Sequence, residues 1–532
     1  MDSQTFKDAA ISSIDEITNY FDTIAERPVV STVTPGYLRK LLPHSAPQEG
    51  EAWPLIQSDI ESKIMPGLTH WQHPSFHAFF PCASSYPGIL GELYSAALSG
   101  ACFNWICSPA VTELETIVLD WLAKALGLPE CFLSTGRTRG GGVIQGSASE
   151  AVLTAMVAAR EKYLRETVPE GLGEREREDV LAGKRGRMVA LGSSGAHSST
   201  KKAAVILGLR FETIPVAAED GYALTGEKLR GKLKELRERG LEPFYLTVTL
   251  GTTDVCAVDD FRGIAEVLEE DRKERERKGG RGEVWVHVDN AYAGAALVCS
   301  EVQEQTDIKV VEQFHSFDMN MHKWLLTNFD ASCLFVRDRS WFVQALTINQ
   351  AVYNNDASEG GLVTDYREWQ IPLGRRFRSL KIWFVLRTYG IKGLQEYIRK
   401  GIKLGEEFAD MLRSRKDMFE ILTGPSFALV VFRMGGNSEE DCTMWTRSLC
   451  EKINTSRKMW VTPTVLDGKY AIRFMTGVRT TEKEHVERAF RSIVGYADEV
   501  MKDDALERFA NESPREWEAE DMKMETESED GD

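Results

Sequence analysis

The sequence lacks the hallmarks of several large protein classes. No apolar run reaches the length that crosses a membrane, so we expect no membrane span. The first residues contain neither a basic segment nor an apolar one, so no secretory signal is predicted. Positive charge is scarce, because 64 Lys and Arg stand against 81 Asp and Glu, for a formal net charge of −17. That balance argues against a nucleic-acid partner and against anionic membrane surfaces.

Paired cysteine spacings, internal repeats and Gly/Ser linkers are absent as well. The nine cysteines are scattered and odd in number, which is typical of free thiols in a reducing cytosol and predicts a cytoplasmic protein. The acidic stretch 516–532 has little to bury and is predicted to be disordered. The remainder can form a sizeable core, since 42% of the 532 residues are hydrophobic, and we expect two or more domains.

Apolar periodicity gives the coarse architecture. Apolar residues at helical spacing over 4–26 predict an amphipathic N-terminal helix, and 88–170 reads mainly as helices. From Met188 onward short apolar strands alternate with helices, which predicts a mostly parallel sheet covered on both faces. After residue 400 we expect a smaller α+β unit, with strands at 427–434 and 469–475.

Two mixed-charge segments interrupt this pattern, at 170–184 and 269–282. Alternating acidic and basic residues are typical of solvated helix faces or loops. We therefore interpret both segments as surface insertions.

Lys323 lies in a mostly apolar run, between His322 and Trp324. Lysine is costly to bury, and desolvation lowers the pKa of an amine, which frees it to attack a carbonyl group. Such an amine can form a Schiff base, for which pyridoxal phosphate is the commonest cofactor. The alternative is a lysine at the end of an element whose ammonium group reaches solvent.

Asp289 ends a predicted buried strand, 284–288, that is rich in β-branched and aromatic residues. An aspartate at the carboxyl end of a parallel strand lies where open α/β sheets bind ligands. There it could pair with a protonated pyridine nitrogen. The alternative is an aspartate that closes a turn after the strand.

Two further segments contain residues suited to such a site. Residues 140–151 (GGGVIQGSASEA) read as a small-residue turn that leads into a helix, and the free N–H groups of a helix start bind anions. We assign Ala148 and Ser149 to the cofactor phosphate, although an ordinary capping turn has the same composition. His197 follows a predicted strand, where its imidazole could lie on a pyridine ring; the alternative is a surface histidine.

Long motifs in one order resemble the group II pyridoxal-phosphate decarboxylases, and in particular the aromatic-L-amino-acid decarboxylases. The resemblance runs from about Pro35 to about Lys400. Its motifs are HVDNAYAG at 287–294, NMHKWLLTNFD at 320–330, FPCASSYP at 80–87, SPAVTELE at 108–115, GSASEA at 146–151 and WQIPLGRRF at 369–377.

The resemblance implies an α/β fold of the type I pyridoxal-phosphate class. It implies a large domain with a mostly parallel seven-stranded sheet, an N-terminal helical segment that packs on the partner subunit of a homodimer, and a small C-terminal α+β domain. The expected divisions are 1–87, 88–400, 401–505 and an acidic tail, 506–532.

It also assigns roles to individual residues. Lys323 would hold the cofactor, Asp289 would pair with its ring nitrogen, His197 would stack on the ring, and Tyr353 in a catalytic loop would return a proton to the substrate. The further cofactor contacts implied are Ala148, Ser149, Thr253, Ala291, Asn320 and His322, with Asp259 orienting groups of the site.

The expected reaction is decarboxylation of tyrosine, L-dopa, tryptophan or 5-hydroxytryptophan to the arylalkylamine. The implied substrate-binding residues are Trp71, Phe79, Phe80, Cys82 and His197, with Ala101 and Phe103 from the neighbouring subunit. Cys82 replaces a threonine usual in animal relatives, and Asn290 replaces a common alanine. The alternatives are an aromatic acetaldehyde synthase, which Tyr353 and His197 argue against, and a non-catalytic binding protein.

His70, His73 and His77 resemble a metal-ligand cluster, but Pro74 interrupts any helix that would align them and no carboxylate cluster adjoins. We expect no metal, and we expect these histidines to line the substrate entrance with Trp71.

Overall fold

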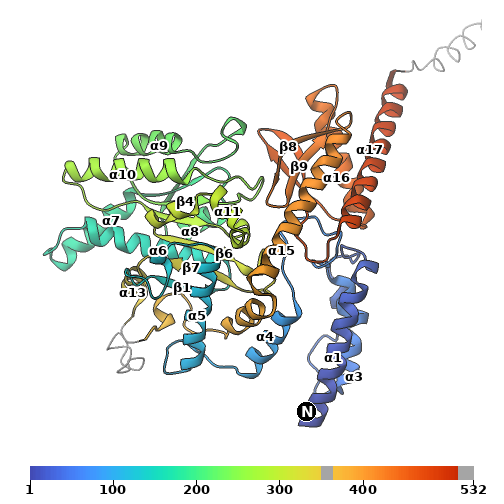
Figure 1. Ribbon diagram of the computed structural model, residues 1–532, viewed down its shortest axis with the longest axis horizontal. Helices are drawn as coiled ribbons and strands as arrows, with labels where there is room; N and C mark the ends of the chain where they lie inside the picture. The colour runs from blue at the N-terminus through green and yellow to red at the C-terminus, as the bar shows by residue number, and fades with distance from the viewer. Residues whose placement is uncertain (349–362, 513–532) are drawn as a thin grey trace, which may run out of the picture.

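The structure is a computed structural model that describes residues 1–348 and 363–512, and a seven-stranded sheet with helices on both faces forms its centre (Figure 1). The strand order is β1-β7-β6-β5-β4-β2-β3. Strands β6, β5, β4, β2 and β3 are parallel, whereas β7 is antiparallel to both its neighbours. The predicted mostly parallel seven-stranded sheet is therefore confirmed. The strands are β1 Gly141–Gln145, β2 Met188–Ser193, β3 Arg210–Ile214, β4 Glu242–Thr249, β5 Trp285–Asp289, β6 Ser316–Asn320 and β7 Ser332–Val336.

Helices connect these strands as the alternating pattern predicted. The charge-rich segment 170–184 overlaps helix α7, Glu174–Arg187, which buries none of its residues, as fits a surface insertion. The helices around the sheet are α4 Tyr86–Ala97, α5 Pro109–Ala125, α6 Ala148–Thr167, α7 Glu174–Arg187, α8 Ser198–Ile206, α9 Gly226–Glu238, α10 Phe261–Arg277, α11 Ser300–Gln305, α12 Met321–Trp324 and α13 Ser340–Leu346.

The central strands divide their side chains between two faces, because successive residues of a strand point to opposite sides. On one face, Val286 and Val288 of β5 and Phe317 of β6 join the largest apolar core. On the other face, the side chains become polar toward the carboxyl ends of the strands, where His287 and Asp289 follow Trp285. The first face therefore anchors the sheet, and the second supplies polar groups at one edge.

Residues 141–145 form strand β1, so the predicted turn over this glycine-rich stretch is wrong there. The glycines serve close packing of the strand. A Cβ atom at Gly142 would meet the Phe335 ring at 2.9 Å, and one at Gly140 would meet the carbonyl oxygen of Cys131 at 1.9 Å. The chain turns only at Gly146 and Ser147, before α6.

A second, four-stranded antiparallel sheet follows the large one, with the order β10-β11-β9-β8. Helix α15, Ser379–Ser414, leads to it across residue 400 and is interrupted at Gly390, whose φ of 61° is in the left-handed region. The expected strands β9 and β11 are present, and β8 and β10 extend them. The elements are β8 Phe419–Ser426, β9 Leu429–Met434, α16 Glu439–Ser456, β10 Thr462–Leu466, β11 Lys469–Met475 and α17 Lys483–Glu512.

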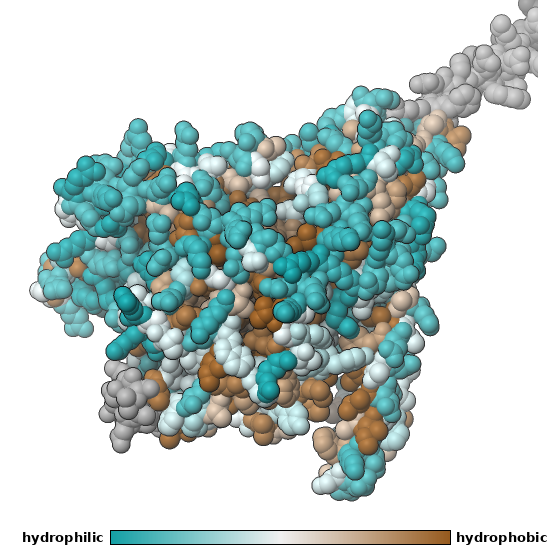
Figure 2. Space-filling model, viewed as in Figure 1, coloured by the Kyte–Doolittle hydropathy of each residue, from teal (hydrophilic) through white to brown (hydrophobic). Residues whose placement is uncertain are grey.

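The predicted N-terminal helix is α1, Ser3–Thr23, which begins where the Asp2 carboxylate accepts a hydrogen bond from Thr5 N. It stands apart from the sheets beside α3, Trp53–Asp59, with the short α2, Tyr37–Leu41, nearby in sequence (Figure 1). Its apolar stripe is open to solvent in the single chain, and brown surface marks the α1–α3 region in Figure 2. The exposed apolar residues of these two helices are Phe6, Ile11, Ile14, Ile17, Leu55 and Ile56.

A buried ion pair joins two of the motifs that are far apart in sequence. Arg375 Nη2 donates to Glu115 Oε1 at 2.6 Å, and the two side chains are 1% and 0% exposed. Glu115 Oε1 also accepts from Ile144 N, and the guanidinium lies 4.4 Å from the centre of the Tyr366 ring. These contacts fix the segment that contains Arg375 against α5 and β1.

We predict that Arg375→Gln lowers the free energy of unfolding by about 3–5 kcal/mol, because it leaves the Glu115 carboxylate buried without its cation. Urea unfolding of both proteins measures the difference. The matched control is Arg399→Gln, which breaks an exposed ion pair with Glu301 and should cost about 1 kcal/mol or less. Equal effects of the two changes would contradict the prediction.

Candidate active site

Three neighbouring strands place polar residues side by side on one face of the large sheet, two of them at the strand ends and one within β6. Thr249 of β4, Asp289 of β5 and Asp318 of β6 lie side by side in Cα register. All three side chains are buried. The carboxyl ends of parallel strands are the usual ligand-binding edge of an open α/β sheet. This edge is therefore the candidate active site.

The Asp289 carboxylate is held in place by the backbone that follows it. Its Oδ1 accepts a hydrogen bond from Ala291 N at 3.1 Å, and the residue is 4% exposed. A fixed carboxylate at this edge can pair with a cationic group of a ligand. The same hydrogen bond places Ala291, another predicted contact, beside Asp289.

Lys323 follows β6 on the short helix α12, and the part of the chain that the structure describes gives its amine neither an ion pair nor a hydrogen bond. Its Nζ lies 5.5 Å from the centre of the Phe80 ring. Burial lowers the pKa of the Lys323 amine, and the carboxylates of Asp289 and Asp318 oppose that shift. Lys323 retains some accessible surface. Its amine nevertheless lies at the same edge of the sheet as Asp289, and its lowered pKa makes it a better nucleophile.

His197 lies at the start of α8, and the charges of Asp289 and Lys323 both act on its imidazole. Its ring has exposed surface, yet surrounding atoms still lower the pKa of the imidazole by desolvation. Nδ1 pairs with the Ser199 hydroxyl at 2.9 Å. The structure therefore brings His197 into the same electrostatic environment as the other two predicted residues.

Asp259 supports the end of β4. Its two carboxylate oxygens accept hydrogen bonds from Leu224 N and Thr249 N, both at 2.7 Å. Burial raises the pKa of Asp259 to about 7. The predicted Thr253 is half-buried in the turn between Thr249 and Asp259.

Helix α6 begins at Ala148, where the Ser147 hydroxyl accepts a hydrogen bond from Glu150 N. The N–H groups of Ala148 and Ser149 have no partner inside the helix, because the first turn lacks preceding carbonyl groups. At the end of β6, the buried Asn320 Oδ1 has no partner among the described residues. The N–H groups at the start of α6 can contact an anion such as a phosphate, whereas Asn320 Oδ1 can accept a hydrogen bond from a ligand. His322 is fixed differently, since its Nδ1 accepts from Ala331 N at 2.8 Å.

An aromatic stack forms a wall beside Lys323 that the sequence reasoning did not identify. Phe80 stacks on Tyr292 with ring centres 3.9 Å apart, and Tyr292 stacks on Trp324 at 4.9 Å. Arg473 lies over the Phe80 ring from the small sheet, 5.1 Å from its centre. Its Nη2 is buried without a partner among the described residues, so it can still bind an anion. The signal was an arginine within the apolar strand 469–475.

The other predicted substrate contacts lie in two groups. Trp71 and Phe79 stack on each other at 5.7 Å and are 37% and 43% exposed. Cys82 is partly buried, and its carbonyl oxygen accepts from Gln72 Nε2. Ala101 and Phe103 lie on the segment after α4, where their carbonyl oxygens accept from Arg375 N and Arg367 N.

The three histidines at 70–77 do not surround an entrance, because all three are buried. His70 Nδ1 pairs with the Tyr20 hydroxyl, and His77 Nδ1 pairs with the Met475 carbonyl oxygen. His73 Nδ1 accepts from Ser75 N. These contacts give the histidines packing roles, and no group of potential metal ligands occurs in 1–348 or 363–512.

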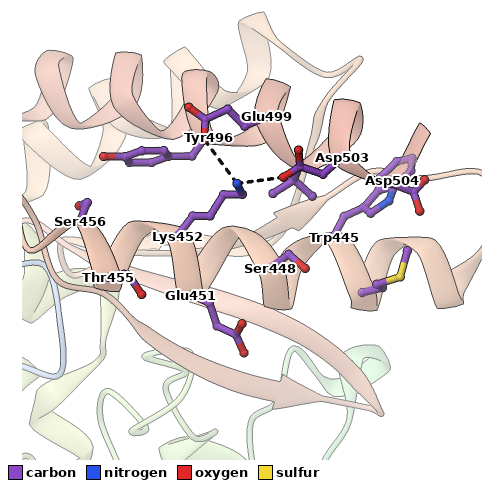
Figure 3. A pocket seen from close by; sticks show the side chains of 12 residues that line it. Trp445, Ser448, Glu451, Lys452, Thr455, Ser456, Tyr496, Glu499, Asp503 and Asp504 are labelled. Atoms are coloured by element: carbon purple, nitrogen blue, oxygen red, sulfur yellow. Dashed lines mark hydrogen bonds and ion pairs between the residues drawn. The ribbon is translucent and has the colours of Figure 1, made fainter. Parts of the chain in front are cut away.

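Tyr353 lies outside the described residues. A groove of about 580 Å³ lies between α16 and α17. Lys452 pairs there with Glu499 and Asp503 (Figure 3). None of its walls belongs to the large sheet, so it is separate from the Lys323 site. Within the described chain no helix has the length and apolar character needed to span a membrane.

Comparisons with known proteins place the chain in one family. Residues 35–435 match the pyridoxal-dependent decarboxylase conserved domain. The chain is 42% identical to aromatic-L-amino-acid decarboxylase of Rattus norvegicus, over 94% of this chain and 99% of that protein. It is 44% identical to phenylacetaldehyde synthase of Arabidopsis thaliana, over 93% and 96%. A crystal structure from Oryza sativa, solved with PLP and tryptamine, has a TM-score of 0.86 and 36% identity, and covers 94% of this chain and 99% of that one.

We predict that Asp259 makes stability depend on pH. Because its folded-state pKa, about 7, is above the usual value of 3.8, the folded protein holds this proton more tightly. Its contribution is therefore fully favourable below pH ~4 and is lost as pH rises to ~7, by roughly 4 kcal/mol at most. Urea unfolding across this range should show the fall in the wild type relative to Asp259→Asn. Exposed Asp22→Asn is the control, and parallel pH curves for wild type and Asp259→Asn would refute the prediction.

Proposed function

The chain belongs to the pyridoxal-dependent decarboxylase family, and we propose that it removes the α-carboxyl group of an aromatic L-amino acid as CO₂ and releases the arylalkylamine. The candidate substrates are tyrosine, L-dopa, tryptophan and 5-hydroxytryptophan. The observation that carries the proposal is the unpaired Lys323 amine beside Asp289 at the ligand-binding edge of the sheet. A cytoplasmic location remains a prediction.

The residues at this edge fit pyridoxal phosphate. Its aldehyde needs a free amine, which Lys323 has. Its ring nitrogen needs a carboxylate, which Asp289 has, and its phosphate needs hydrogen-bond donors, which the start of α6 has. The unpartnered Asn320 Oδ1 and Thr249 Oγ1 show that the edge also holds buried polar atoms not used by the fold itself. When bound, the cofactor supplies a ring that withdraws electrons from the substrate Cα.

We assign the following roles to the chain's own residues. Lys323 would hold the cofactor, and Asp289 would pair with its ring nitrogen. His197 and Ala291 would contact the cofactor ring. Phosphate and neighbouring contacts come from Ala148, Ser149, Thr253, Asn320 and His322.

The substrate would be oriented by its aromatic ring and its carboxylate. The Phe80 ring centre lies 5.5 Å from the Lys323 amine, and Trp71, Phe79 and Cys82 precede or follow Phe80 in sequence. The unpartnered Arg473 Nη2 is suited to a carboxylate. In a water-poor site, loss of a charged carboxylate as neutral CO₂ is favoured. Tyr353 or His197 would then protonate Cα as the general acid.

We propose that the enzyme is a homodimer, with Ala101 and Phe103 of each subunit completing the other's substrate pocket. The exposed apolar stripe of α1 supports this, because a contiguous apolar surface marks an interaction site. Light scattering should give twice the 59.7 kDa of one chain. Ile14→Glu on α1 should shift the protein toward monomer, whereas Leu506→Glu on α17 should not. A wild-type monomer would contradict the proposal.

Product identification tests the proposed reaction. With the four candidate amino acids, we expect one or more to give CO₂ and amine in equal amounts, without peroxide. The second candidate function is an aldehyde synthase, which the similarity to phenylacetaldehyde synthase favours, and it would yield aldehyde, ammonia and peroxide. Tyr353→Phe should move the wild-type products toward aldehyde, because it removes the acid that protonates Cα. Aldehyde as the main wild-type product would overturn the decarboxylase assignment.

A further inference from the structure

A chain of buried polar side chains lies directly behind Asp289. Trp285 Nε1 donates to Ser316 Oγ at 2.8 Å, and the same hydroxyl pairs with His287 Nδ1 at 2.8 Å. His287 Nε2 is 3.2 Å from Asp318 Oδ1, which is ion-pair distance, although the two groups are not aligned as a hydrogen bond. Each of these side chains is 1% exposed or less. This row of side chains ends at the Asp318 carboxylate, to which the proposed function assigns no role.

The hydrogen bonds between these side chains fix how the His287 ring is oriented. Tryptophan N–H is only a donor, so Ser316 Oγ accepts from Trp285. The Ser316 hydroxyl also pairs with His287 Nδ1, which fixes the orientation of the imidazole ring. His287 Nε2 is then the ring atom that faces Asp318, and a proton on this nitrogen would stabilise a negative charge there.

Asp318 is placed to act on the candidate active site. It is opposite Asp289 in the parallel pairing of β5 and β6, and its charge acts on the Lys323 amine. Both of its oxygens lack a hydrogen bond within the described chain. The titratable or charged groups around it are His287 and Asp289 from β5, Lys323 from α12, Tyr245 from β4 and Cys333 from β7.

We propose that Asp318 is a positioning residue whose carboxylate, faced by His287, supplies a second negative charge that increases the affinity of the Lys323 nitrogen for a proton. This inference rests on the proposed function of Lys323. Asp289 alone has to serve the ring nitrogen of the cofactor, whereas Asp318 lies one strand farther along and can act through space.

The balance of charges makes this residue sensitive to its surroundings. The pKa of Asp318 is raised to about 6, mainly by burial and in part by the charge of Asp289, while His287 and Lys323 oppose the shift. Loss of the His287 N–H would therefore favour the neutral acid. A neutral side chain at position 318 would remove this negative charge, and the Lys323 nitrogen would then lose its proton more easily.

The test is a pH titration of the visible absorption of the lysine-bound cofactor, near roughly 420 nm for the protonated form. In Asp318→Asn, the midpoint, which is the pH at which half of this absorption is lost, should fall by about half a unit to one unit. That shift corresponds to a three- to tenfold weaker affinity for the proton. The matched control is Asp120→Asn, a buried carboxylate that binds Ser134 and is absent from the Lys323 environment. Its midpoint should stay unchanged.

A second variant covers the case in which Asp318→Asn does not fold. His287→Leu leaves the Asp318 carboxyl group but removes the imidazole that faces it, so the midpoint should again move down. The double variant should show no larger shift than Asp318→Asn alone. In cofactor-free protein, acetic anhydride labelling of Lys323 should likewise reach half its maximal rate at a lower pH in Asp318→Asn.

The outcomes separate two failures. A wild-type protein that gains no band with pyridoxal phosphate would overturn the proposed function and this inference with it. A normal band whose midpoint does not move in Asp318→Asn or His287→Leu, or moves as much in Asp120→Asn, would overturn the role of Asp318 alone.

Discussion

One electrostatic arrangement organises this protein: an amine held among apolar groups, with two buried carboxylates on neighbouring strands. Lys323 gains nucleophilic character from burial, and Asp289 and Asp318 limit how far that goes. Neither carboxylate forms a tight ion pair with the amine, so the amine stays available. A direct salt bridge would have fixed the lysine as an ammonium and removed its chemistry.

The fold accommodates these buried charges by keeping the apolar and polar side chains of β5 and β6 on opposite faces of the sheet. Val286, Val288 and Phe317 anchor one face in the largest core. The opposite face contains His287, Asp289 and Asp318, each fully or almost fully buried. Asp259 then fixes the neighbouring strand end through two backbone N–H groups, so the polar edge is built on rigid elements.

The sequence was sufficient for features with a local signal. The alternation of strands and helices from Met188 onward predicted the parallel sheet. The positions of Asp289 and Lys323 in apolar runs predicted two residues of the candidate site. Features that depend on distant segments could not be derived this way. The contacts of Arg473 with Phe80 and of Arg375 with Glu115 each join residues more than 250 positions apart. The glycines of β1 were misread because close packing, and not a turn, requires them.

The central claim is that the amine of Lys323 carries the cofactor. Reduction of the holoenzyme with borohydride makes that bond permanent, and peptide mapping by mass spectrometry then locates it. We expect one pyridoxyl phosphate group per chain, on Lys323. An adduct on another lysine, or none at all, would contradict this account.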